Sequence, residues 1–226
     1  MRPDQHSMFS RKKMNLDITH RCPLECLCCQ RWSSFIRHGI KVPGEDISLD
    51  NFKKLADHFL HLNFCGQVSD PVHHPKFIEI LEHTAVMKRS VSVHHASGAK
   101  PEKWYPKAFA ANPKARWIFG IDGLPEESNM YRINQDGEKI YRMMEVARGI
   151  LVSKPVWQYI VFSYNENHIQ DALKMAKAID VEFMTLISSR WRSHDDPLKP
   201  KNSAMRLDLY SEDVNKKNNR IVKNEK

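Results

Sequence analysis

Residues 14–29 read MNLDITHRCPLECLCC and join a short alternating segment to a cluster of cysteines. Met14, Leu16 and Ile18 alternate with polar residues, which is typical of a β-strand. Four of the five cysteines then follow within eight residues: Cys22, Cys26, Cys28 and Cys29. We therefore predict a strand that ends in a cysteine-rich loop.

Strand-like and helix-like patterns alternate along the rest of the chain. We predict strands over residues 14–18, 62–68, 90–94, 115–121, 156–162 and 182–187. We predict helices over residues 49–62, 75–86, 102–111, 136–152 and 166–179, the first with Ser48 as its N-cap. This alternation favours parallel strands joined by right-handed crossovers. It predicts an α/β fold and leaves open either a doubly wound sheet or a barrel, full or partial.

The composition is that of an ordinary globular chain of 226 residues, with 41% hydrophobic and 27% charged residues. No segment approaches the ~18 apolar residues of a membrane span. Residues 1–13 are polar and basic, with no apolar region of a secretory signal. We expect a flexible lead over residues 1–13, one domain over 14–189, an irregular, partly disordered tail over 190–226, and a cytoplasmic location. Residues 31–46 are expected to be mostly loop.

Polar residues follow several predicted strands at the point where each strand ends. Ser69 and Asp70 follow the second strand, His94 and His95 the third, and Asp122 the fourth. In parallel α/β folds, chemistry is found at the carboxyl ends of the strands. The coincidence favours an enzyme.

The cysteine loop contains the spacing C-x3-C-x2-C at Cys22, Cys26 and Cys29. Three thiolates from one tight loop can hold three irons of a [4Fe–4S] cluster and leave the fourth iron open. A zinc site on the same cysteines and His20 is the alternative, although structural zinc usually takes ligands from two separated pairs. Cys65 stands alone in an apolar strand and is expected to be a buried thiol.

This motif, placed directly after the first strand of a βα repeat, resembles the radical S-adenosylmethionine (SAM) superfamily over residues 14–188. The resemblance implies a partial (βα)6 barrel with a [4Fe–4S] cluster whose open iron binds the amino and carboxylate groups of SAM. It also implies an external flavodoxin- or ferredoxin-like electron donor. Cleavage of SAM would give methionine and a 5′-deoxyadenosyl radical that abstracts hydrogen from a substrate.

Two further stretches carry the resemblance. Residues 66–71, GQVSDP, are similar to the Gly-Gly-Glu-Pro segment of the family, which implies that Ser69 and Asp70 bind the SAM amino group. An Asp-Pro turn that closes a strand is the alternative. Residues 120–126 and Arg132 are similar to the Ser-x-Asp-Gly-Pro…Arg pattern of the SPASM and anaerobic sulfatase-maturase subgroup, with Gly120 in place of serine. That likeness implies that Asp122 and Arg132 belong to the SAM site and that Arg132 pairs with the SAM carboxylate.

Three more residues are assigned to the cofactor site by the same resemblance. Gln158 is expected to face the ribose, and Cys28 takes the place of an aromatic residue near the adenine or serves as an iron ligand. His95, with His94 and Ser97, is expected to face SAM or the substrate, although a histidine is often structural. The auxiliary-cluster cysteines of the subgroup are not found, because no cysteine follows Cys65.

The resulting hypothesis is a radical SAM enzyme that abstracts hydrogen from a peptide or protein. A first alternative is a radical SAM enzyme acting on a nucleoside or a small anionic metabolite, which the formal charge of +8 permits. A second is a non-catalytic module, stabilised by zinc or a cluster, that binds RNA. The sequence identifies no general base or hydrogen donor.

Overall fold

The computed structural model describes residues 13–31, 35, 38–39, 44–188, 191, 193, 195–206 and 222–223. Six parallel strands form one sheet: β1 Lys13–Leu16, β2 His61–Phe64, β3 Ser90–His95, β4 Arg116–Gly120, β5 Val156–Val161 and β6 Glu182–Ile187. Each strand pairs with the next one in sequence. The predicted α/β fold with parallel strands is confirmed.

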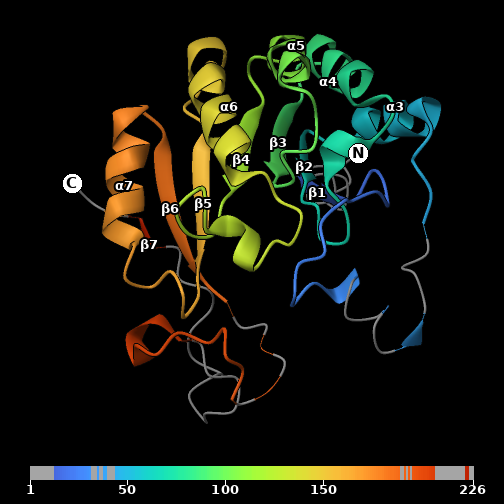
Figure 1. Ribbon diagram of the computed structural model, residues 1–226. Helices are drawn as coiled ribbons and strands as arrows, with labels where there is room; N and C mark the ends of the chain where they lie inside the picture. Colours follow the sequence, from blue (N-terminus) through green and yellow to red (C-terminus); the bar gives the residue numbers. More distant parts are fainter. Residues whose placement is uncertain are drawn as a thin grey trace, which may run out of the picture.

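Five helices lie between these strands in sequence: α3 Leu49–His58, α4 Phe77–Val86, α5 Tyr105–Ala111, α6 Gly137–Ile150 and α7 Ile169–Ala178. A doubly wound sheet reverses its strand order at a switch point and carries helices on both faces. Here the order never reverses, and right-handed crossovers then place every helix on the same face. Figure 1 shows the helices arrayed along one side of the strands. The arrangement is therefore that of a partial (βα)6 barrel.

The helix and strand ends differ from the predicted ones by a few residues. Ser48 caps α3 as predicted, because its hydroxyl accepts a hydrogen bond from the Asn51 N–H at 3.2 Å. The helix ends at His58 instead of Leu62, since Phe59 already has an extended backbone. Leu62 instead lies buried in β2. The sequence placed Leu62 both at the end of the predicted helix and at the start of the predicted strand, and the pairing of β2 with its neighbours puts it in the strand.

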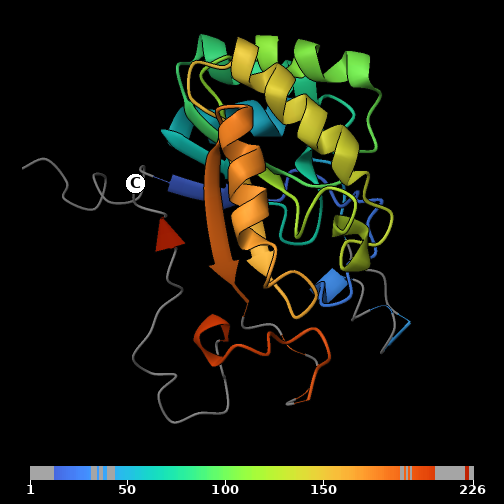
Figure 2. The same cartoon turned by 60° about the vertical axis from the view of Figure 1, so that its left-hand side comes forward.

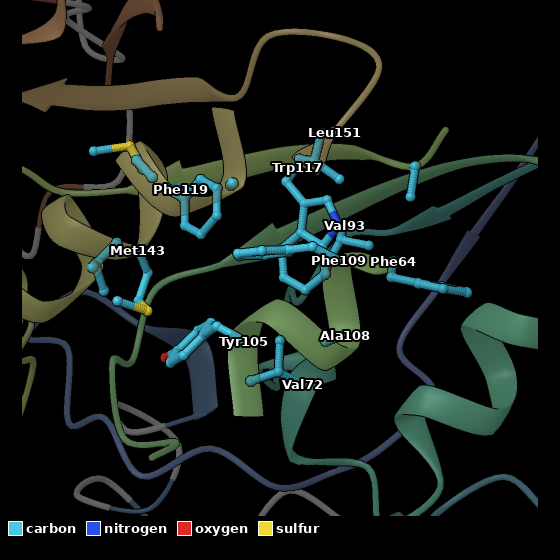
Figure 3. Close-up of a cluster of buried hydrophobic side chains, with 14 of the residues drawn as sticks. Phe64, Val72, Val93, Tyr105, Ala108, Phe109, Trp117, Phe119, Met143 and Leu151 are labelled. Atoms are coloured by element: carbon cyan, nitrogen blue, oxygen red, sulfur yellow. The ribbon is translucent and has the colours of Figure 1, made fainter. Parts of the chain in front are cut away.

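The main core lies between the sheet and the helices. Trp117 and Phe119, two residues apart on β4, both point toward α5 because strand side chains alternate. The ring of Phe109 on α5 meets Trp117 edge-on, with centroids 4.8 Å apart. Figure 3 shows this cluster, which also includes Tyr105. With one face of the sheet committed to this core, the other face is left to line a cavity.

Part of the predicted irregular tail is ordered against the barrel. Residues 195–206 follow β6 and lie beyond the tips of β5 and β6 in Figure 2. The Ser163 N–H donates to the Leu198 carbonyl at 2.9 Å, and the carboxylate of Glu166 accepts from the N–H groups of Lys201 and Asn202. Contacts of this kind, made by backbone N–H and carbonyl groups, leave no periodic pattern of apolar residues, so the sequence could not predict them.

Two further observations concern segments that were predicted to be mostly loop or irregular. Val222–Lys223 forms β7, a two-residue antiparallel strand beside β6, where the sequence predicted no strand. Within the predicted loop 31–46, the described residues Arg31, Phe35 and His38 have helical backbone. Residues 1–12 and most of 207–226 lie outside the described residues. No helix in the described part of the chain is long and apolar enough to cross a membrane.

Candidate functional site

A cavity of about 410 Å³ opens at the carboxyl ends of the parallel strands. Inner-face residues of four adjacent strands line it, namely His94 on β3, Ile118 on β4, Gln158 on β5 and Leu186 on β6. The cavity therefore lies on the face of the sheet opposite the helices, which is the interior of a partial barrel. Its volume is in the range of small-molecule sites.

The structure brings most of the predicted site residues together at this cavity. Eight of the ten line it: Cys22, Cys26, Cys29, Ser69, Asp70, His95, Arg132 and Gln158. The remaining two, Cys28 and Asp122, are not among its lining residues. Residues from five separate segments of the sequence thus share one site.

The cysteine loop is bound to the segment that carries Arg132. The Glu25 N–H donates to the Ile133 carbonyl at 3.1 Å, and the Leu27 N–H donates to the Tyr131 carbonyl at 3.3 Å. These two hydrogen bonds flank Arg132 on both sides. They fix the distance between the loop and the guanidinium, which lie more than 100 residues apart in sequence.

The three motif cysteines are reduced thiols in this cavity. Burial raises the pKa of Cys22 to about 12 and that of Cys26 to about 11, so the uncharged thiols are favoured in the absence of a cation. Among the described residues, no group of three or more His, Cys, Asp or Glu side chains is arranged to hold a single metal ion. A four-iron cluster takes each cysteine on a different iron and so spreads its ligands more widely. Three thiols around one cavity fit that group.

Cys28 lies away from the cavity. It packs, with Leu24 and Phe162, into a second apolar cluster beside the cysteine loop. The aromatic ring that does line the cavity near Cys26 is Tyr131, whose centroid is 4.3 Å from that of Phe162. The assignment of Cys28 to the adenine remains a prediction. Sequence reasoning missed Tyr131, although its position next to Arg132 was a usable signal.

Arg132 forms a buried ion pair with Asp122. Its Nε donates to Oδ2 of Asp122 at 2.7 Å, and Asp122 has no exposed surface. The other oxygen of Asp122 accepts the Ile160 N–H at 2.8 Å. Burial alone would lower the pKa of Arg132, but the carboxylate of Asp122 raises it above its ordinary value, so the guanidinium stays charged. Asp122 therefore orients Arg132 from below and does not face the cavity.

Gly120 explains a departure from the family pattern. A Cβ at this position would lie 2.9 Å from Nη2 of Arg132. The serine of the pattern does not fit here with Arg132 in its present position. The guanidinium occupies the space that a side chain at residue 120 would take.

The side chain of Asp70 is already engaged by the protein. Its Oδ2 accepts the N–H groups of Ala96 at 3.1 Å and Ser97 at 2.9 Å, and lies 3.0 Å from Nδ1 of His95. Although burial alone would raise it, His95 and these N–H groups hold the pKa of Asp70 well below its ordinary range. Asp70 thus joins the ends of β2 and β3. Its predicted contact with the SAM amino group remains a prediction.

His95 and His94 point to opposite sides of β3. His95 is buried between Asp70 and Tyr105, whose hydroxyl lies 3.0 Å from Nε2. His94 faces the cavity, and burial, together with the nearby charge of Arg116, lowers its pKa to about 4. The imidazole of His94 is therefore neutral near pH 7.

Ser69 and Gly66 shape the turn after β2. The Ser69 hydroxyl donates to Oδ1 of Asp17 at 2.8 Å. Gly66 has a φ of +54°, and a Cβ there would lie 2.7 Å from the Ser69 carbonyl oxygen. Only glycine permits this turn without strain. The predicted role of Ser69 in SAM binding remains a prediction.

Gln135 was not identified from the sequence. Its buried Nε2 donates to the carbonyl of Gly120 at 2.7 Å and to the carbonyl of Ala96. It thereby joins the ends of β3 and β4 beneath the cavity. A single glutamine between a loop and a helix carries no motif that would have identified it.

Comparison with solved structures places this architecture among known folds. SuiB of Streptococcus suis bound to its precursor peptide SuiA matches with a TM-score of 0.62 and 10% identity, over 77% of this chain and 39% of that chain. Methylornithine synthase (PylB) matches with a TM-score of 0.56 and 11% identity, over 85% and 58%. The enzyme anSMEcpe with bound AdoMet and the Kp18Cys peptide matches with a TM-score of 0.58 and 17% identity, over 84% and 56%.

These proteins are radical SAM enzymes. The chain has the radical SAM core fold. The predicted likeness is thereby confirmed at the level of fold, and it includes the partial barrel. The chain spans about two fifths of SuiB and just under three fifths of PylB and anSMEcpe. No family model matches the chain, and no curated protein matches its sequence.

Proposed function

We propose that this chain binds a [4Fe–4S] cluster and SAM in the 410 Å³ cavity and initiates radical chemistry there. One observation carries the proposal: Cys22, Cys26, Cys29 and a charged Arg132 meet at one cavity of a radical SAM fold. When bound, such a cluster supplies one electron to SAM, whose carbon–sulfur bond breaks to give methionine and a hydrogen-abstracting 5′-deoxyadenosyl radical.

The protein side chains have separate tasks in this proposal. Cys22, Cys26 and Cys29 provide thiolates, and Arg132 offers a planar bidentate donor to the SAM carboxylate. Asp122 holds that guanidinium in place from outside the cavity. Gln158 is in position for the ribose, since it lines the same cavity from β5.

A peptide or protein is the proposed substrate, with an external one-electron donor and a cytoplasmic site of action. Support for a peptide comes from two similar structures, because SuiB was solved with SuiA and anSMEcpe with the Kp18Cys peptide. Both likenesses are in fold, so the substrate class is an analogy.

The test is anaerobic reconstitution with iron and sulfide, followed by dithionite and SAM. We expect about four irons per chain and the formation of 5′-deoxyadenosine. Replacing Cys22, Cys26 or Cys29 by alanine should abolish both. Cys28→Ala, in the same loop but outside the cavity, is the matched control and should retain the cluster. Bound zinc in place of iron, with SAM left intact, would contradict the proposal.

A further inference from the structure

A second cavity, of about 710 Å³, lies against the cysteine loop, and half of its ten described lining residues are arginine, lysine or histidine. His20, Arg21, Arg31, His73 and Lys100 contribute nitrogen atoms, whereas Glu25 is the one carboxylate among its described lining residues. Cys22, Leu24 and Arg31 line both cavities, so this part of the loop lies between them. Among the described residues that line this second cavity, the function proposed above uses Cys22 alone.

The cations of this cavity differ in how far they are neutralised. Arg21 forms a two-nitrogen pair with Asp46, with its Nε and Nη2 each 2.9 Å from Oδ2. Within the described part of the chain, Arg31 and Lys100 pair with no carboxylate. Arg31 has a long contact of 3.5 Å to the Leu24 carbonyl, and Lys100 lies 5.3 Å from the ring centre of Trp104. Neither cation is thus held in a direct ion pair, although the carboxylate of Asp70 acts on Lys100 from farther away and Arg31 acts on the Cys22 thiol.

Arg31 and Lys100 are both partly buried. Removing a cation from water costs free energy unless an anion or hydrogen-bond acceptors replace the lost hydration. Burial lowers the pKa of Lys100, because the loss of hydration disfavours the charged form. An oxyanion bound in the cavity would supply negative charge and hydrogen-bond acceptors to the cations that line it.

We propose that this second cavity binds the oxyanion group, phosphate or carboxylate, of a small molecule. Its volume suits a small ligand and not a polymer, and Leu24 and Pro23 supply apolar wall for the remainder of such a molecule. The proposal is independent of the function proposed above, because it depends on neither iron nor SAM.

The test is isothermal titration of the full-length chain, in low salt, with inorganic phosphate and separately with succinate. We expect saturable binding of at least one probe with a Kd of about 1 mM, a value that calorimetry resolves. The probe that binds tells a phosphate-bearing ligand from a carboxylate-bearing one. Failure of both probes to bind saturably would overturn the proposal.

Variants locate the binding. Lys100→Ala and Arg31→Ala should each raise the Kd at least tenfold, and Lys100→Arg should restore it, because guanidinium also pairs with oxyanions. Lys103→Ala removes the same charge from an exposed position outside the cavity and should leave the Kd within twofold. Equal weakening by Lys103→Ala would show general charge attraction and overturn the site. Thermal unfolding of each variant checks that it is folded.

Discussion

At the scale of single residues, one absent side chain allows Arg132 to reach the cavity. Gly120 has an ordinary backbone, so its role is not conformational freedom. Its role is space, because Nη2 of Arg132 fills the volume of a Cβ. The sequence identified both residues through their resemblance to the family pattern, in which serine takes the place of Gly120. The contact between them depends on strand geometry that no motif encodes.

We predict that Gly120→Ala displaces the guanidinium of Arg132 and lowers the free energy of unfolding by at most about 1 kcal/mol, because the atoms that must shift are the tip of a flexible side chain. Denaturant unfolding monitored by circular dichroism measures the change. Gly149→Ala is the matched control, since a Cβ there meets nothing within 4 Å and lies in α6. It should stabilise the chain by about 0.5–1 kcal/mol. Equal effects of the two substitutions would contradict the steric account.

The buried pair gives a second residue-scale prediction. Asp122→Asn keeps the shape but leaves the Arg132 charge uncompensated, so we expect a loss of about 3–5 kcal/mol in the free energy of unfolding. Chemical denaturation checks it. Arg116→Ala breaks an exposed pair with Glu182 and should cost less than about 1 kcal/mol. If Asp122→Asn lowered the free energy of unfolding by less than Arg116→Ala does, the Asp122–Arg132 pair would not be buried in solution.

At the scale of elements, strand alternation separates two neighbouring histidines that the sequence treated together. The sequence placed both at the end of β3, which was correct. The alternation in Ser90 to His95 assigns His95 to the face of the buried Val91 and Val93, and His94 to the other face, but the sequence analysis treated the two histidines alike. Similarly, the periodicity of α3 did not fix its end, which depends on where β2 begins to pair.

The element-scale prediction concerns pH. In the unfolded chain His94 takes up a proton near pH 6.5, whereas in the folded chain its pKa is about 4. Between these values only the unfolded state binds the proton, so the free energy of unfolding falls as the pH drops from 6.5 to 4. His94→Gln should flatten this part of the curve, measured by urea unfolding across the pH range.

Exposed His58 on α3 is the control for this experiment. His58→Gln should leave the pH dependence between 4 and 6.5 as it is in the unsubstituted chain. If His94→Gln gives the same curve as His58→Gln, then His94 is not buried against the cavity.

At the scale of the whole molecule, the chain continues beyond β6 and returns to the barrel. Glu166 accepts two backbone N–H groups from residues 201 and 202, and Leu198 packs into the cluster that supports the cysteine loop. The sequence predicted an irregular tail here because it has few apolar residues and no period. A segment that is held by a few hydrogen bonds and one leucine does not need an apolar periodicity, so its sequence does not show that it packs on the barrel.

We predict that Glu166→Ala loosens this segment by about 1.4 kcal/mol, equivalent to a tenfold larger open population. Trypsin should then cleave after Lys201 about ten times faster under native conditions, as followed by mass spectrometry. Glu145→Ala, on an exposed position of α6, removes the same charge elsewhere and should leave the rate unchanged. An unchanged rate in Glu166→Ala would mean that these hydrogen bonds do not hold the segment.

The sequential strand order has a consequence for self-association. In the described part of the chain, β1 has one neighbouring strand, β2, so its other side forms an edge of the sheet. That edge is only four residues long and exposes Lys13 and Asn15. Short edges that carry lysine discourage the addition of a strand from another molecule. The same strand that leads into the reactive loop thus also protects the molecule from edge-to-edge aggregation.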